Sequence, residues 1–347
     1  MSNPVDKKNV YVILGFLRCG TSVITRSLQA LNIDLGEKLV TNTGWNPTGY
    51  FEDNEIMHTI HAKLFSTLGH QTRSIRLFEK ELLVNNPALD SIKNSAMQLI
   101  KQRTQTTNHF GFKDPSISKI LPFWQSIFDK LTIKDHYIIA LRNPLSCAKS
   151  YHDLTGTDLE LGLLLWLMHF IPAVQDAMDR RTIFVSYDLM MQNPVAQVLR
   201  IKNLLQILTP DNPLAMQIFA ETFLNKNLYH NRDDEESLKN HPATAVVPLC
   251  MKTYNLLLQL AKDEISFQHE KFIIEWQHIQ DELRTLYPLY CYLDSVLRRH
   301  KILNRQLIRM KKSIIWKLLY PLYWIDDKFR GKRIAKRAEK KLVTAYE

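Results

Sequence analysis

The sequence has few of the features that mark secreted, zinc-binding or membrane-spanning proteins. Its four cysteines stand singly, with no Cys-x-x-Cys pair, which argues against a disulfide framework and a zinc site and favours a reducing compartment. The longest apolar stretch, residues 161–174, is shorter than the roughly 20 apolar residues of a membrane-spanning helix. The apolar run near the N-terminus is also too short for a signal peptide. We therefore expect a soluble or peripheral chain with a core of its own.

Positive charge is concentrated at the C-terminal end. The 347 residues have a formal net charge of +10, but residues 298–347 alone carry sixteen Lys or Arg against four Asp or Glu. The rest of the chain is nearly neutral, so the charge indicates a local electrostatic role for the tail. Residues 313–347 combine a group of aromatic residues with basic residues on both sides, which is typical of an amphipathic anchor on an anionic membrane surface. Because this spacing favours lipid, we expect no nucleic-acid ligand.

Short apolar runs alternate with segments of helical periodicity through the first two thirds of the chain. The runs are residues 10–16, 109–113, 136–142 and 182–187, and the helical segments lie near 20–31, 53–68, 86–106, 117–130 and 144–180, with an interruption near 153–158. Strands buried on both faces have nearly continuous apolar sequences. The pattern therefore predicts an α/β fold, a P-loop-like parallel sheet flanked by helices, with ligands at the carboxyl ends of its strands.

The last third of the chain has a helical pattern throughout. A heptad seam runs from Phe272 to Ile314, and Pro288 within it predicts either the start of a second helix or a kink. We divide the chain into an α/β domain (1–232), a helical or coiled-coil extension (233–312) and the basic aromatic tail (313–347). The seam could pair two copies of the chain as a homodimer or fold back on itself.

The segment GFLRCGTS, residues 15–22, has the Gly-x-x-x-x-Gly frame of a phosphate-binding loop. Thr21 stands where nucleotide triphosphatases have the Lys that reaches the β- and γ-phosphates. A helix beginning near Gly20 would direct its N–H groups and its positive end at an anion. Thr21 and Ser22 can donate hydroxyl hydrogen bonds, and Arg18 supplies a fixed charge. The loop suits a single 5′-phosphate whose leaving group needs no metal.

A second motif, LRNPLSCAKSY at 141–151, places Arg142 after a strand and Ser150 two turns into the following helix. At 1.5 Å per residue the two side chains can approach one phosphate from two sides. With GFLRCGTS, NPTGYFED (46–53) and FVSYDLMMQNP (184–194), this motif resembles the sulfotransferases that use 3′-phosphoadenosine 5′-phosphosulfate (PAPS), especially their bacterial carbohydrate-type branch. The likeness spans residues 10 to 231.

The resemblance implies PAPS as co-substrate and no metal ion. It implies that Arg142 and Ser150 grip the 3′-phosphate, and that a late loop, LNKNLYHNR at 224–232, closes over the nucleotide or the acceptor. The cofactor-binding residues that it implies are Arg18, Cys19, Gly20, Thr21, Ser22, Arg142, Ser150 and His230.

The resemblance also indicates catalytic residues. Carbohydrate and protein-tyrosine sulfotransferases use a Glu after the first helix as base, and Glu52 stands at that place, followed by Asp53 as the expected N-cap of a helix from Asn54. In GFKDP, Lys113 would stabilise the sulfuryl or phosphate oxygens. Asp114 is the second candidate for the base, because no His follows where the cytosolic relatives have one.

We therefore predict in-line transfer of a sulfuryl group from PAPS to a hydroxyl of a glycan or glycolipid, with a carboxylate as base. Two alternatives stay open: a P-loop nucleotide or small-molecule kinase, and an inactive membrane-associated scaffold. The missing Lys counts against the kinase, and the retained phosphate-binding residues count against the scaffold. We expect a cytoplasmic protein, attached to the inner face of the plasma membrane if the tail binds lipid.

Overall fold

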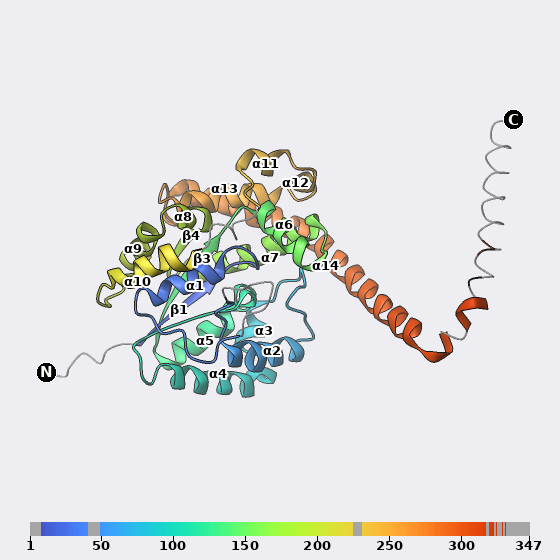
Figure 1. Ribbon diagram of the computed structural model, residues 1–347, viewed down its shortest axis with the longest axis horizontal. Coiled ribbons are helices and arrows are strands. Elements are labelled where there is room, and N and C mark those ends of the chain that lie inside the picture. The colour runs from blue at the N-terminus through green and yellow to red at the C-terminus, as the bar shows by residue number, and fades with distance from the viewer. Residues whose placement is uncertain are drawn as a thin grey trace. The chain divides into compact units, whose positions relative to one another are not determined.

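The computed structural model describes residues 8–40, 49–224 and 231–316, with positions 319–322, 324, 328 and 330. The chain divides into two compact units, Met1–Pro288 and Leu289–Glu347. Figure 1 shows the first unit as a sheet between layers of helices.

Four parallel strands form the sheet in the order β2-β1-β3-β4. They are β1 (Asn9–Leu14), β2 (His109–Lys113), β3 (Lys134–Leu141) and β4 (Arg181–Ser186). All four strands predicted from the sequence are confirmed, with ends that differ by at most two residues. The strands are buried on both faces, which explains their continuous apolar sequences. The predicted α/β class, a parallel sheet flanked by helices, is confirmed.

Helices cover both faces of the sheet. One face packs against α1 (Thr21–Gln29), α8 (Tyr187–Gln192), α9 (Pro194–Leu205) and α10 (Pro213–Ile218), around a core that includes Tyr11, Ile138 and Val185 of the strands. On the other face α5 (Leu121–Leu131) and α13 (Leu249–Ala261) pack on β3 and β4, and α7 (Leu159–Ala177) contacts both helices. Figure 1 labels these helices, with α1 in blue and α13 in orange.

The other helical segments are the π-helix Ile56–His61, α2 (Ala62–Thr67), α3 (Lys80–Val84), the 3₁₀ helix Pro87–Leu89, α4 (Asp90–Arg103), the 3₁₀ helix Pro115–Lys119, α6 (Pro144–Thr155), the π-helix Phe219–Phe223, α11 (Glu235–Asn240) and α12 (Pro242–Val246). They include those predicted near 53–68, 86–106, 117–130 and 144–180, whereas α3 and the π-helix Phe219–Phe223 were not predicted. The predicted interruption near 153–158 is the turn at Gly156, which caps α6 with a φ of 69°. Among the described residues no single helix has the length and apolar composition to cross a membrane. Within this part of the chain only α6 and α7 taken together have that length and composition, and they are bent by 118° relative to each other.

One long helix, α14 (Glu270–Lys312), continues without a break through Pro288, so no second helix starts there. The seam residues before Pro288 are buried in the first unit: Phe272, Trp276, Ile279 and Leu283. In the second unit most seam residues after it are exposed, for example Leu289 at 60% and Leu303 at 62%. The boundaries at 232 and 312, the coiled coil and the homodimer stay predictions. The basic tail lies largely outside the described residues.

Candidate functional site

The loop after β1 is shaped by residues with unusual backbone angles. Gly20, just before α1, has a φ of 81°, and a Cβ atom there would lie 2.1 Å from Cδ2 of the Tyr187 ring. Arg18 also has a positive φ, of 69°. This backbone holds the loop against the start of α1, whose first-turn N–H groups have no partner within the helix. The arrangement fits the anion site that the sequence predicts.

Arg18 and Ser150, 132 positions apart in the sequence, meet beside this loop. The Arg18 Nε donates to Ser150 Oγ at 2.9 Å, and Arg142 Nη1 donates to the Arg18 carbonyl at 2.9 Å. Burial, and next the positive charge of Arg142, lower the pKa of the Arg18 guanidinium from its ordinary value. Two guanidinium groups and a hydroxyl in one place favour a multiply charged anion. The structure thus brings Arg18, predicted for the 5′-phosphate loop, together with Arg142 and Ser150, predicted for the 3′-phosphate.

Arg142 is fixed from three directions. Besides its bond to Arg18, its Nη2 donates to the carbonyl of Asn231 at 3.1 Å. Its guanidinium carbon lies 4.8 Å from the centroid of the Tyr187 ring, at cation–π distance. The same ring packs against Gly20, so Tyr187 supports both the loop and the arginine.

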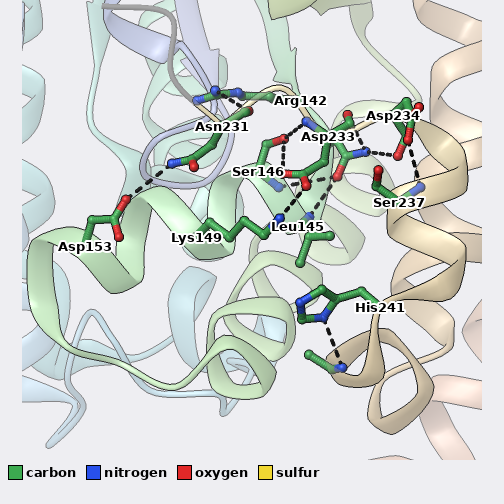
Figure 2. Close-up of polar contacts among 12 residues, drawn as sticks. Arg142, Leu145, Ser146, Lys149, Asp153, Asn231, Asp233, Asp234, Ser237 and His241 are labelled. Atoms are coloured by element: carbon green, nitrogen blue, oxygen red, sulfur yellow. Dashed lines mark hydrogen bonds and ion pairs between the residues drawn. The ribbon is translucent and has the colours of Figure 1, made fainter.

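A strap of residues 231–234 lies along the first turns of α6 (Figure 2). Asp233 accepts from Lys149 Nζ at 2.5 Å and from Ser146 Oγ at 3.0 Å, and its own N–H donates to Ser146 Oγ at 2.9 Å. Asn143 donates from its side chain to the carbonyls of Asp233 and Asp234. Because Asn231 in the strap contacts Arg142, these bonds fix one of the partners of Arg142.

Glu52 and Lys113 form a buried ion pair at the carboxyl end of β2. Lys113 Nζ lies 2.8 Å from Glu52 Oε1 and 3.3 Å from Ser22 Oγ in the first turn of α1. Lys113 is 2% exposed and Glu52 9%. Burial raises the pKa of the Glu52 carboxyl above its ordinary value, although the Lys113 charge opposes this. A carboxylate of raised basicity and an ammonium group therefore lie beside the phosphate loop.

The backbone around Glu52 is held by its neighbours. Phe51 has a positive φ of 56°, and its ring packs edge-on against Phe223. Asp53 accepts from the N–H groups of Glu55 and Ile56, which confirms it as the N-cap of the helical segment from Asn54. Arg103 binds Asp53 at 2.8 Å and Glu55 at 2.5 Å. Asp53 and Glu55 are thus structural, and Glu52 alone of the three carboxylates contacts Lys113.

Asp114 lies in a separate buried network. It binds His61 Nδ1 at 2.6 Å and accepts from both the N–H and the hydroxyl of Ser116. Trp124 donates to His61 Nε2 at 2.9 Å, so the His61 proton is on Nδ1 and is donated to Asp114. Burial would raise the pKa of Asp114, but His61 and Ser116 outweigh it, and the pKa lies below its ordinary value. This network joins the end of β2 to the π-helix Ile56–His61 and to α5.

The other predicted cofactor-binding residues differ in their burial and in their hydrogen-bond partners. Thr21 is buried at the start of α1, and Ser22 donates to the carbonyl of Tyr50 at 3.2 Å. Cys19 is fully buried, with its N–H bonded to Phe16 and its sulfur facing another cysteine. His230 lies outside the described residues, so its role stays a prediction.

Two parts of this site have no recognisable signal in the sequence. Asp233 lies at the predicted domain boundary, and His61 lies within a predicted helical segment. Each makes its contacts over more than 50 positions of sequence, to α6 and to Asp114 respectively. No local pattern marks such pairs. Within the described ranges, no group of three or more His, Cys, Asp or Glu side chains is arranged to hold a metal ion.

The comparison with solved structures gives matches of low sequence identity and low TM-score. The sulfotransferase domain of the Synechococcus PCC 7002 olefin synthase is 15% identical with a TM-score of 0.39, covering 82% of this chain and 98% of that one. The sulfotransferase STF9 of Mycobacterium avium is 16% identical with a TM-score of 0.41, covering 73% and 77%. Retinol dehydratase, solved with retinol and PAP, is 14% identical with a TM-score of 0.32, covering 69% and 68%. No protein-family model and no curated protein matches the sequence.

Proposed function

We propose that the protein is a PAPS-dependent sulfotransferase that acts on a hydroxyl of a glycan or glycolipid. The observation that carries this proposal is the meeting of Arg18, Arg142 and Ser150 beside a phosphate loop that lacks the triphosphatase lysine. PAPS has a 3′-phosphate and a single 5′-phosphate in its anhydride with sulfate. The arginine cluster would take the 3′-phosphate, and the first turn of α1 would take the 5′-phosphate.

In this proposal Glu52 is the general base. Its Oε1 accepts from Lys113, and its Oε2 would take the proton of the acceptor hydroxyl as the oxygen attacks sulfur. The pKa of Glu52 is raised by burial, which makes the carboxylate a stronger base. Asp114 is the weaker candidate, because its oxygens already accept hydrogen bonds from His61 and Ser116.

Lys113 would stabilise the transferring group. Its Nζ lies between Glu52 Oε1 and Ser22 Oγ, so its charge stands between the base and the phosphate loop. In-line displacement moves the sulfuryl group along that path, from the 5′-phosphate oxygen to the acceptor oxygen. A fixed positive charge there lowers the energy of the transition state. The products are the sulfated acceptor and adenosine 3′,5′-bisphosphate.

The acceptor class follows from the resemblance to the carbohydrate-type branch and from the basic tail. A surface glycan or its lipid-linked precursor is built at a membrane, where a cytoplasmic enzyme with a basic aromatic tail would be held on the inner face.

Calorimetric binding of adenosine 3′,5′-bisphosphate tests the cofactor site, with AMP and ATP–Mg²⁺ as controls. We expect tight binding of the bisphosphate that is lost for AMP and for the Arg142→Ala variant. Equal or tighter binding of ATP–Mg²⁺ would instead support a kinase. A screen of glycan and glycolipid acceptors for sulfate transferred from PAPS then tests the acceptor class.

A further inference from the structure

Two cysteines face each other under the phosphate loop. The sulfur atoms of Cys19 and Cys147 are 2.7 Å apart, and both side chains are fully buried. Uncharged atoms in ordinary contact lie roughly 3.5–4.0 Å apart, whereas a disulfide bond is about 2.05 Å long. The two sulfurs are thus closer than non-bonded atoms and need to move less than about 1 Å to bond.

The pair joins the two elements that carry the predicted phosphate ligands. Cys19 follows Arg18 in the loop, and Cys147 lies in α6, one turn before Ser150. The Cys147 sulfur also lies 3.8 Å from the Arg18 carbonyl and 3.9 Å from that of Arg142. A bond between the sulfurs would therefore tie the loop directly to the helix that completes the arginine cluster.

The other cysteines have no such arrangement. Cys250 is buried, and its sulfur donates to the carbonyl of Leu163 at 3.1 Å. Cys291 is partly exposed. All four cysteines are free thiols, so any bond between Cys19 and Cys147 is a reversible modification of this state.

We propose that Cys19 and Cys147 are a thiol–disulfide modification site that links the phosphate loop to α6. A small disulfide such as oxidised glutathione is the oxidant that forms the bond between the two cysteines. One protein thiolate attacks the reagent and releases one glutathione, and the second protein thiolate displaces the other. The two protein thiols lose two electrons and two protons, and the reagent gains them as two thiols.

The surroundings set the rate of this reaction. Burial raises the pKa of the Cys19 thiol well above its ordinary value, so little thiolate forms at neutral pH. Reaction requires the loop to open from α6 long enough for the reagent to enter. We therefore expect slow oxidation that accelerates as pH rises. In a reducing compartment such a bond forms only under oxidative conditions.

The test begins with the unmodified full-length protein, which is incubated with oxidised glutathione, alkylated and digested with trypsin. Cleavage after Arg18 and Arg26 leaves Cys19 in peptide 19–26, and cleavage after Arg142 and Lys149 leaves Cys147 in peptide 143–149. We expect these two peptides to be linked, with a mass two hydrogens below their sum, and the link to disappear with dithiothreitol. The bond closes a loop of more than 100 residues, so Tm should rise by on the order of 10 °C.

Matched variants separate this pair from the other thiols. Cys250→Ser and Cys291→Ser should keep the linked peptides and the rise in Tm, and Cys19→Ser and Cys147→Ser should each lose both. The proposal is overturned if the oxidised protein keeps four titratable thiols, or if its linked peptides contain Cys250 or Cys291. Because the unmodified chain gives the decisive result, a variant that fails to fold leaves the conclusion intact.

Discussion

Replacing Asp233 by Asn should weaken the binding of adenosine 3′,5′-bisphosphate without touching any predicted ligand of that nucleotide. Asp233 holds the strap 231–234 on α6 through Lys149 and Ser146 (Figure 2), and the strap provides the Asn231 carbonyl that binds Arg142. Asparagine keeps the size of the side chain and one acceptor oxygen, but it removes the negative charge. The variant therefore loosens the strap while α6 itself stays in place.

The contacts of Asp233 set the size of this effect. Hydrogen bonds to charged groups contribute about 1.5–3 kcal/mol each. The Lys149 side chain is 34% exposed and that of Asp233 is 9%, so solvent reduces the ion pair to the lower end of this range. Asn143 still binds the strap carbonyls in the variant. We expect a loss of about 1.4 kcal/mol, which is a tenfold weaker Kd.

Calorimetry of both nucleotides on matched variants is the assay. Asp234→Asn is the control, because Asp234 is the next residue of the strap and its side chain caps α11 by accepting from the N–H of Ser237 at 2.7 Å, while its bond to Asn143 uses the backbone carbonyl, which the substitution keeps. We expect it to bind the bisphosphate like the unmodified protein. AMP, which lacks the 3′-phosphate, should not distinguish Asp233→Asn from the unmodified protein. Bisphosphate binding that is unchanged in Asp233→Asn, or equally weakened in both variants, would refute the role of the strap.

Four further outcomes follow from the same geometry. Glu52→Gln should lower the rate of sulfuryl transfer by about 10²–10⁴-fold with unchanged bisphosphate affinity, whereas the neighbouring Glu55→Gln should leave the rate within about twofold. Because the pKa of Glu52 is raised, kcat/KM should fall as the pH falls through a value above 4.5, which a pH–rate profile measures. The pKa of Asp114 is lowered in the fold, so the stability that it contributes is present above about pH 4 and lost as pH falls further. In Asp114→Asn the free energy of unfolding, measured by denaturation at a series of pH values, should depend less on pH below about pH 4. Gly20→Ala should lower Tm and bisphosphate affinity together, because its Cβ would collide with the Tyr187 ring; a variant with unchanged values would show that the loop can shift.

The fold was predictable because its signals are local. Each strand of the sheet is a short apolar run, and each run is followed by a segment of helical period, so the order along the chain determines the class. The arginine cluster was predictable for the same reason. Arg142 follows β3 directly, Arg18 lies in the loop after β1, and the carboxyl ends of β1 and β3 are adjacent in the sheet.

The strap was not predictable, because its contacts depend on the path of the chain. Asp233 lies in an acidic stretch without apolar period, which usually indicates a solvated segment. Its partners Ser146 and Lys149 are 87 and 84 positions earlier in the sequence. Nothing in the sequence of their helix indicates that another segment of the chain lies beside it. The two come together only in the folded chain.

The choice between Glu52 and Asp114 shows why sequence leaves a base unassigned. Both carboxylates lie next to residues of the predicted site. Neither the residue type nor the position in the sequence tells whether a carboxylate is a structural hydrogen-bond acceptor or a catalytic base. The difference lies in their donors. Asp114 accepts hydrogen bonds from the imidazole of His61 and from the hydroxyl and the backbone N–H of Ser116. These donors stabilise the ionised form of the Asp114 carboxyl. The carboxylate of Glu52 accepts from the ammonium group of Lys113, which lowers its pKa, but burial raises the pKa by more. The affinity of Glu52 for a proton therefore rises. A base must accept a proton during the reaction, and of the two only Glu52 is in surroundings that favour doing so.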